Sequence, residues 1–108
     1  MEQKKRLSVI KRFLAKNKID FSENVNLLSC KKKTIADIYI KKLRIVVHAS
    51  DGNDQEFYEK VKKWYKPFFI RESESDEFLV EKMQNCIIER MKQLHKYSFK
   101  QQKAYYKK

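Results

Sequence analysis

The stretch from residue 34 to residue 54, TIADIYIKKLRIVVHASDGND, constrains the fold more than any other part of the chain. Two runs rich in β-branched and aromatic residues, 34–40 and 43–50, are separated by only two lysines, which predicts a β-hairpin. The polar turn 51–54, which holds the only glycine, ends the second strand. One carboxylate, Asp37, interrupts the first strand, and it needs a partner because burying an unpaired charge is costly.

Hydrophobic periodicity predicts the elements on either side of this hairpin. Apolar residues at helical spacing indicate helices, short apolar runs indicate strands, and Pro67 ends the helix before it. The resulting order is helix, strand, strand, strand, helix, strand, helix, and the elements outside the hairpin are helix 3–17, strand 24–29, helix 54–65, strand 67–71 and helix 76–97. The strand after Pro67 is fully apolar, which predicts a central strand parallel to 43–50 in a mixed sheet.

The apolar stripes of the two later helices supply much of the predicted core. The stripe of helix 54–65 includes Trp64, so we expect this side chain to be largely buried. The stripe of the last helix consists of Leu79, Met83, Cys86, Ile87, Met91 and Leu94. Because Cys86 lies on that stripe, a core position is favoured over a nucleophilic role.

Length and composition predict one intracellular domain. The chain has 108 residues, and no apolar run approaches the roughly 20 residues that span a bilayer. The first residues lack the apolar segment of a signal peptide. Two cysteines are too few for a disulfide framework, so we expect reduced thiols, a cytoplasmic location and no membrane partner.

The distribution of charge predicts a polyanionic partner. The net charge is +12: residues 1–50 hold 13 bases and four acids, residues 51–89 hold six bases and ten acids, and residues 90–108 hold seven bases and no acid. Basic ends of this kind favour nucleic acid, although a solvated lysine-rich surface has the same composition. Lysine outnumbers arginine, which favours phosphate contacts over base reading. The candidate nucleic-acid ligands are Lys31, Lys32, Lys33, Lys96, Lys100 and Lys103, the last three among aromatic residues that can stack on bases.

Three short segments carry a resemblance to a known family. They are Asp37 in ADIYI, the turn Asp51-Gly52, and the end of the fourth strand, Phe69-Ile70-Arg71. With the element order, they resemble the PD-(D/E)XK nuclease superfamily, in the branch similar to very-short-patch-repair endonucleases. The resemblance covers about residues 5–72. It implies an α/β fold with a restriction-endonuclease-like αβββαβ core, a mixed sheet and an extra C-terminal helix.

The same resemblance implies a domain organisation and a site. Residues 1–97 form one restriction-endonuclease-like domain, and 98–108 form a basic aromatic tail. Asp37 matches the aspartate of the motif, but the glutamate expected on the next strand is absent: counted along the hairpin it falls on His48, and counted back from the turn it falls on Ala49. The candidate catalytic residues are therefore Asp37, His48 and Asp51, with Asp37 and His48 as metal ligands.

Three functions stay open at this point. Since family chemistry needs carboxylates around a divalent cation, the missing glutamate favours a catalytically degenerate protein that binds nucleic acid, DNA above all. The second is an active nuclease with a rearranged site, using Mg²⁺ or a softer ion such as Mn²⁺, with Asp51 or Asp54 moving into place. The third is a protein-interaction module in which the acidic segment 72–81 binds a basic partner.

Overall fold

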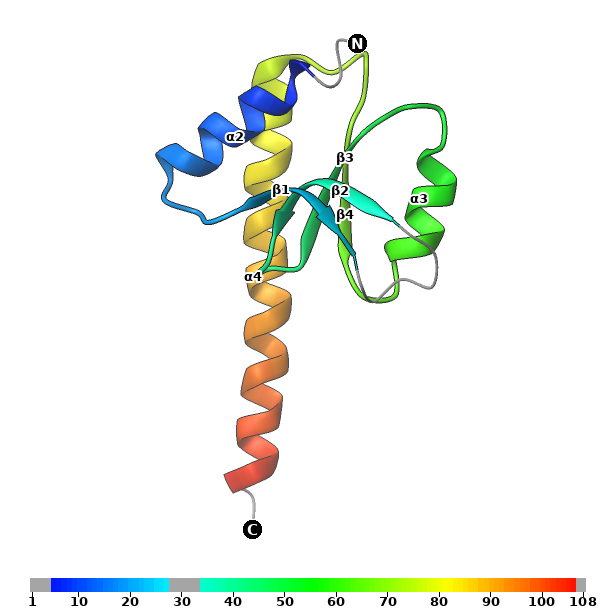
Figure 1. The fold of residues 1–108 in the computed structure, drawn as a ribbon. Helices are drawn as coiled ribbons and strands as arrows, with labels where there is room; N and C mark the ends of the chain where they lie inside the picture. Colours follow the sequence, from blue (N-terminus) through cyan, green and yellow to red (C-terminus); the bar gives the residue numbers. More distant parts are fainter. Residues whose placement is uncertain (1–4, 28–33, 107–108) are drawn as a thin grey trace.

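A computed structural model describes the backbone of residues 5–27 and 34–106, and side chains within these ranges up to residue 95. The described elements follow the predicted order and types (Figure 1). They are α2 (Leu7–Lys16), β1 (Ser22–Asn26), β2 (Ile35–Ile40), β3 (Ile45–Ala49), α3 (Asp54–Val61), β4 (Lys66–Ile70) and α4 (Asp76–Tyr106).

The strands form one mixed sheet in the order β1-β2-β3-β4. Neighbours β1 and β2, and β2 and β3, are antiparallel, whereas β3 and β4 are parallel. The prediction of a mixed sheet with a compact β3–α3–β4 unit is confirmed. The prediction that the apolar strand after Pro67 is central is wrong, because β4 is an edge strand whose apolar side chains are covered by the helices on the two faces of the sheet. This topology brings the end of β3 and the start of α3 to one end of the sheet, and the β2–β3 and α3–β4 connections to the other.

Helices cover both faces of the sheet, which gives three layers. On one face, α2 and α4 pack over residues such as Ile38, Val47 and Ile70, and on the other α3 packs over Val46 with Phe57. Strand β3 shows why: its side chains alternate between the two faces, and every one of its apolar residues is buried. The sheet is therefore the central layer, and the ends of its strands remain open to solvent for a functional site.

The prediction that Trp64 is buried is wrong. Helix α3 ends at Val61, and the amides of Trp64 and Tyr65 both hydrogen-bond to the Val61 carbonyl, which tightens the chain into a turn. This turn directs Tyr65 inward, with 8% of its surface exposed, and leaves Trp64 47% exposed. Helical periodicity places the two rings on one stripe only while the helix continues, and here it has already ended.

Other differences between the predicted and the observed elements concern where strands, turns and helices begin and end. The hairpin turn takes the four residues 41–44, because Arg44 adopts a left-handed φ of 54° that ends the turn one residue before β3. Strand β1 lies earlier than predicted and is an exposed edge, so hydrophobicity defines it poorly. Helix α4 begins at Asp76, after the Ser75 hydroxyl accepts the Phe78 amide, and its backbone continues to Tyr106.

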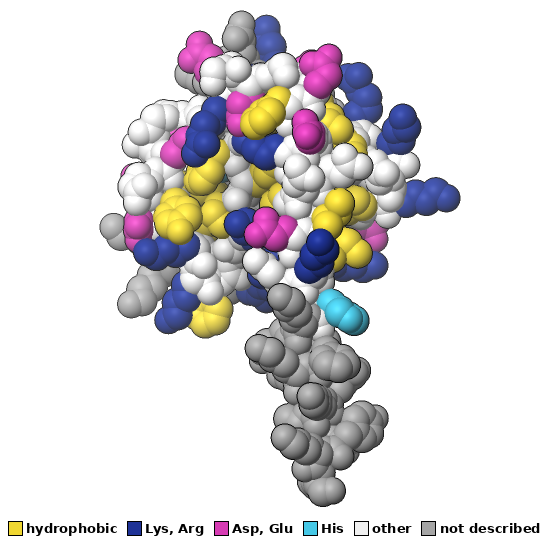
Figure 2. All heavy atoms as spheres, turned by 180° about the vertical axis from the view of Figure 1, so that it is seen from behind, with side chains coloured by type: hydrophobic (Ala, Val, Ile, Leu, Met, Phe, Trp, Pro, Cys, Tyr) yellow, Lys and Arg dark blue, Asp and Glu magenta, His cyan; other side chains and the backbone are white. Residues whose placement is uncertain are grey.

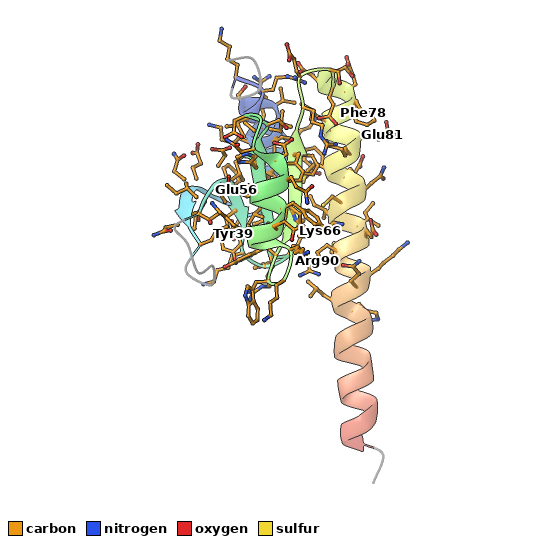
Figure 3. The ribbon with its side chains drawn as sticks, turned by 90° about the vertical axis from the view of Figure 1, so that its right-hand side faces the viewer. Tyr39, Glu56, Lys66, Phe78, Glu81 and Arg90 are labelled. Carbon is orange, nitrogen blue, oxygen red and sulfur yellow. The ribbon has the colours of Figure 1, made fainter. Side chains whose placement is uncertain are left out.

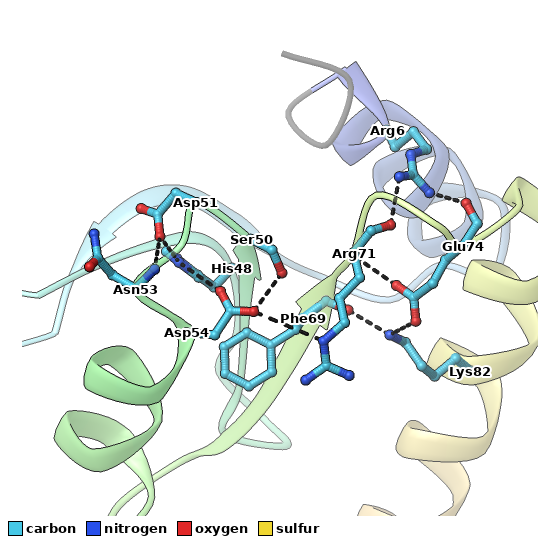
Figure 4. Close-up of polar contacts among 10 residues, drawn as sticks. All are labelled: Arg6, His48, Ser50, Asp51, Asn53, Asp54, Phe69, Arg71, Glu74 and Lys82. Atoms are coloured by element: carbon cyan, nitrogen blue, oxygen red, sulfur yellow. Dashed lines mark hydrogen bonds and ion pairs between the residues drawn. The ribbon is translucent and has the colours of Figure 1, made fainter.

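The outer edge of β4 is closed by polar contacts. Pro67 lacks an N–H group, the Phe69 carbonyl accepts Lys82 Nζ at 2.6 Å, and the Arg71 amide donates to Glu74 Oε1 at 2.7 Å (Figure 4). Lys82 Nζ also lies 2.5 Å from Glu74 Oε2. These caps occupy groups that an added strand would need, so β-strand addition by a partner is disfavoured here.

Candidate functional site

Three potential metal ligands meet where β3 ends. His48 Nε2 lies 3.3 Å from Asp51 Oδ1 and 3.9 Å from Asp54 Oδ1 (Figure 4). One donor atom from each residue lies within 4.8 Å of the others. We call His48, Asp51 and Asp54 the acidic cluster. Two of its members, His48 and Asp51, line an open hollow of about 220 Å³ beside Thr34 and Glu56, whereas Asp54 does not line it.

Local structure positions each member of the acidic cluster. His48 is the last residue but one of β3, and its ring stacks on Phe57 of α3 at 4.3 Å and an interplanar angle of 14°. Asp51 Oδ1 accepts the Asn53 amide at 3.0 Å, which holds the turn, and Gly52 takes the φ of 94° that this turn requires. Asp54 opens α3, where a carboxylate also suits the helix dipole.

The two oxygens of the Asp54 carboxylate have different surroundings. Its Oδ2 accepts the Ser50 hydroxyl at 2.8 Å and lies 3.9 Å from Arg71 Nε. Its Oδ1 is buried and has no hydrogen-bond partner within the described part of the chain. A buried carboxylate oxygen without a hydrogen-bond donor is unfavourable, although the Asp54 side chain as a whole is 28% exposed and Oδ1 lies 3.9 Å from the His48 ring.

The electrostatic surroundings keep Asp51 ionised. The hydrogen bond from the Asn53 amide lowers the pKa of the Asp51 carboxyl, with a smaller lowering from His48, while partial burial acts in the opposite direction. Asp51 therefore presents a negative charge to the His48 ring at neutral pH.

Asp37 is not a member of the acidic cluster. Its Oδ2 accepts the Ala49 amide from the neighbouring strand at 2.8 Å. Of the predicted catalytic residues, the fold thus brings His48 and Asp51 together, while the described contact of Asp37 is with the backbone of β3. Asp54 joins them, and its place directly after the Asp51 turn was the sequence signal for it.

A second candidate surface lies at the opposite end of β3. The turn 41–44, the turn 62–65 with Lys66 at the start of β4, and Arg90 of α4 are linked there by hydrogen bonds. Arg44 Nε donates to the Trp64 carbonyl at 2.9 Å, and Arg90 Nε donates to the Leu43 carbonyl at 2.8 Å. Figure 3 shows Lys66 and Arg90 near one another, where the body ends and α4 continues.

We call this surface the basic end and define it by six bases and one aromatic residue: Lys41, Lys42, Arg44, Lys63, Lys66, Arg90 and Trp64. None of the six bases takes part in an ion pair among the described residues. By contrast, the face seen in Figure 2 mixes basic, acidic and apolar side chains. Sequence reasoning missed the basic end because its two turns are far apart in the chain, although both are free of acids.

The side chains of all six predicted nucleic-acid ligands lie outside those that the structure describes. Lys31, Lys32 and Lys33 lie outside the described residues. Lys96, Lys100 and Lys103 lie on the backbone of α4, on the half that extends past the basic end (Figure 1), and their side chains are not described. The basic end therefore adds described bases beside this part of α4.

Comparison with known protein families, curated proteins and solved structures finds no match. Within the described residues, no helix combines the length and apolar character needed to cross a membrane. Function must be inferred from the two surfaces themselves.

Proposed function

We propose that this protein binds nucleic acid through the basic end and does not cut it with Mg²⁺. It would be a catalytically degenerate relative of the PD-(D/E)XK nucleases, which it resembles in its order of helices and strands. The observation that carries the proposal is the meeting of two basic turns and Arg90, which are remote in sequence, at an end of the sheet that also exposes a tryptophan.

The chemistry of the basic end suits a nucleic acid whose nucleobases are accessible. Six cationic side chains without carboxylate partners attract phosphates, and such contacts do not depend on the nucleotide sequence. The Lys63 ammonium lies 5.2 Å from the centre of the Trp64 ring, so a cation and an aromatic face are offered together. Exposed aromatic rings among cations favour single-stranded nucleic acid, whose bases can stack on them.

Loss of cleavage is supported by the surroundings of Asp37. The expected glutamate is replaced by His48 or Ala49, and the Asp37 carboxylate accepts a backbone amide. Mg²⁺ prefers an octahedral set of oxygen ligands, which this position does not supply. The basic end also lies about 13 Å along β3 from the acidic cluster, taking about 3.3 Å per residue over the strand.

A salt titration of binding tests the proposal. Fluorescence anisotropy would follow single-stranded and duplex DNA and RNA oligonucleotides against the full chain and the variant K41Q/K42Q/K63Q. Each lost phosphate contact should make the slope of log K against log salt shallower by about 0.7–0.9. If all three lysines make contacts, the slope falls by about 2–3 and affinity falls at every salt concentration.

The matched control is the variant K5Q/R12Q/K16Q, which removes the same charge from exposed positions at the other end of the molecule, on or beside α2 (Figure 1). Its slope should stay close to that of the unmodified chain. Equal slopes for all three proteins would refute binding at the basic end, and a loss confined to the α2 variant would move the interface to that helix.

An active nuclease with a rearranged site is the second candidate, and the acidic cluster favours it. It predicts cleavage of an oligonucleotide with Mn²⁺ that is lost in Asp54→Asn. Under our proposal the unmodified chain produces no cleavage with Mg²⁺. Robust Mg²⁺-dependent cleavage that disappears in Asp37→Ala would overturn the degenerate assignment.

A further inference from the structure

We propose that His48, Asp51 and Asp54 form a binding site for one divalent transition-metal ion. The site lies at the end of β3 remote from the basic end, and it does not use Asp37. It therefore differs from the metal site that the resemblance implied. Its ligands come from a strand, a turn and the first residue of a helix.

The distance from His48 Nε2 to Asp51 Oδ1 matches the spacing of ligands around a single ion, and the other donor atom of the cluster lies within 4.8 Å of both. Metal–nitrogen and metal–oxygen bonds of about 2.1 Å place neighbouring ligands of a four- or six-coordinate ion about 3.0–3.4 Å apart. The observed separations from His48 Nε2 are 3.3 Å to Asp51 Oδ1 and 3.9 Å to Asp54 Oδ1. Ion binding would have to draw Asp54 Oδ1 closer to His48 Nε2.

An independent observation comes from the unpartnered oxygen of Asp54. Ser50 and Arg71 occupy Oδ2, yet Oδ1 is buried without a donor among the described residues and faces His48. A cation would supply the interaction that this atom lacks. The Ser50 and Arg71 contacts would then orient the ligand, as outer partners do in metal sites.

The imidazole is also held in place before any ion binds. Phe57 stacks on the His48 ring, and Phe69 meets it edge-on at 6.0 Å. The two aromatic contacts fix the plane of the ring while its Nε2 edge points to both carboxylates (Figure 4). Such preorganisation lowers the entropic cost of binding.

The donor set identifies the class of ion. One imidazole nitrogen with two carboxylate oxygens suits Mn²⁺, Zn²⁺ or a similar first-row ion better than Mg²⁺, which keeps an octahedral oxygen shell. Three protein ligands leave coordination positions for water or an exchangeable ligand on the side of the hollow. A bound ion would thus keep free coordination positions, as catalytic metal sites do.

Binding of Mn²⁺ alone tests the site in the full chain, without nucleic acid, so its outcome is independent of the proposed function. Electron paramagnetic resonance detects free Mn²⁺, and its signal should fall until one ion is bound per chain. Asp54→Asn and His48→Gln should each weaken binding at least tenfold. Glu56→Gln, which alters a carboxylate of the same hollow outside the cluster, should bind like the unmodified chain.

A second measurement needs no variant and therefore does not depend on variants folding. Mn²⁺ should first broaden the amide NMR signals of residues 48–54 in the unmodified protein. Binding that is unchanged in both ligand variants, broadening centred elsewhere, or no Mn²⁺ uptake at millimolar concentration would each overturn the proposal.

Discussion

The carboxylate of Asp37 has a structural role, because it accepts a hydrogen bond from the backbone. It accepts the amide of Ala49, a residue that is only 3% exposed, across the β2–β3 pair. Removing the acceptor leaves a buried N–H without a partner, so Asp37→Ala should lower the free energy of unfolding by about 1–3 kcal/mol. Asp37→Asn keeps an acceptor oxygen and should cost less. Urea unfolding of the three proteins checks this, and equal losses in both variants would contradict it.

Asp51 predicts a pH dependence at the scale of one residue. Its pKa is lowered in the folded state, chiefly by the Asn53 amide, from an ordinary value of 3.8. A lowered carboxyl pKa stabilises the fold above the unfolded pKa, and the contribution is lost as pH falls through the folded pKa.

Asp51→Asn should therefore be less stable than the unmodified chain at pH 7, and the difference should shrink below about pH 4. Urea unfolding at pH 7, 4 and 3 measures this difference. A difference that is constant over that range, or that grows as pH falls, would show that the ionised carboxylate does not stabilise the fold.

At the scale of elements, α4 provides a matched pair of methionines. Met83 is fully buried against the sheet, whereas Met91 is 55% exposed. Met83→Ala should cost about 2–5 kcal/mol because it opens a cavity in the core. Met91→Ala should stay within about 0.5 kcal/mol. Thermal unfolding of both variants tests whether the first half of α4 belongs to the core, and equal costs would contradict it.

The kinds and order of the elements were predictable from the sequence because each has a strong local pattern. The hairpin has paired β-rich runs around two lysines, and α4 has a capping serine and a long apolar stripe. Positions after a helix end were not predictable in the same way. Met91 and Trp64 were both assigned to buried stripes, yet α3 stops at Val61, and α4 passes the end of the sheet near Arg90 (Figure 1), so that Met91 is exposed.

The candidate site was predictable only where its residues are close in sequence. His48 and Asp51 are three residues apart, so the turn after β3 brings them together whatever the rest of the fold does. The role of Asp37 depends on which group of the next strand it meets, and strand composition does not specify this. The basic end depends on tertiary contacts, such as that from Arg90 to the Leu43 carbonyl.

At the scale of the whole molecule, β3 separates two surfaces of opposite charge. The acidic cluster lies where the strand ends, and the basic end lies where it begins, next to the part of α4 that extends past the body (Figure 1). Nucleic acid bound at the basic end would avoid the acidic cluster, since like charges repel. This separation is the structural reason for expecting binding without Mg²⁺-dependent cleavage.

The most direct test of binding at the basic end is the fluorescence of Trp64, the only tryptophan in the chain. Trp64 is 47% exposed and lies on that surface, so its emission reports on this surface alone. Titration with a single-stranded oligonucleotide should quench its emission, with the same midpoint as the change in anisotropy of the labelled oligonucleotide. An anisotropy change that saturates while the intensity and wavelength of Trp64 emission stay constant would contradict the proposed interface.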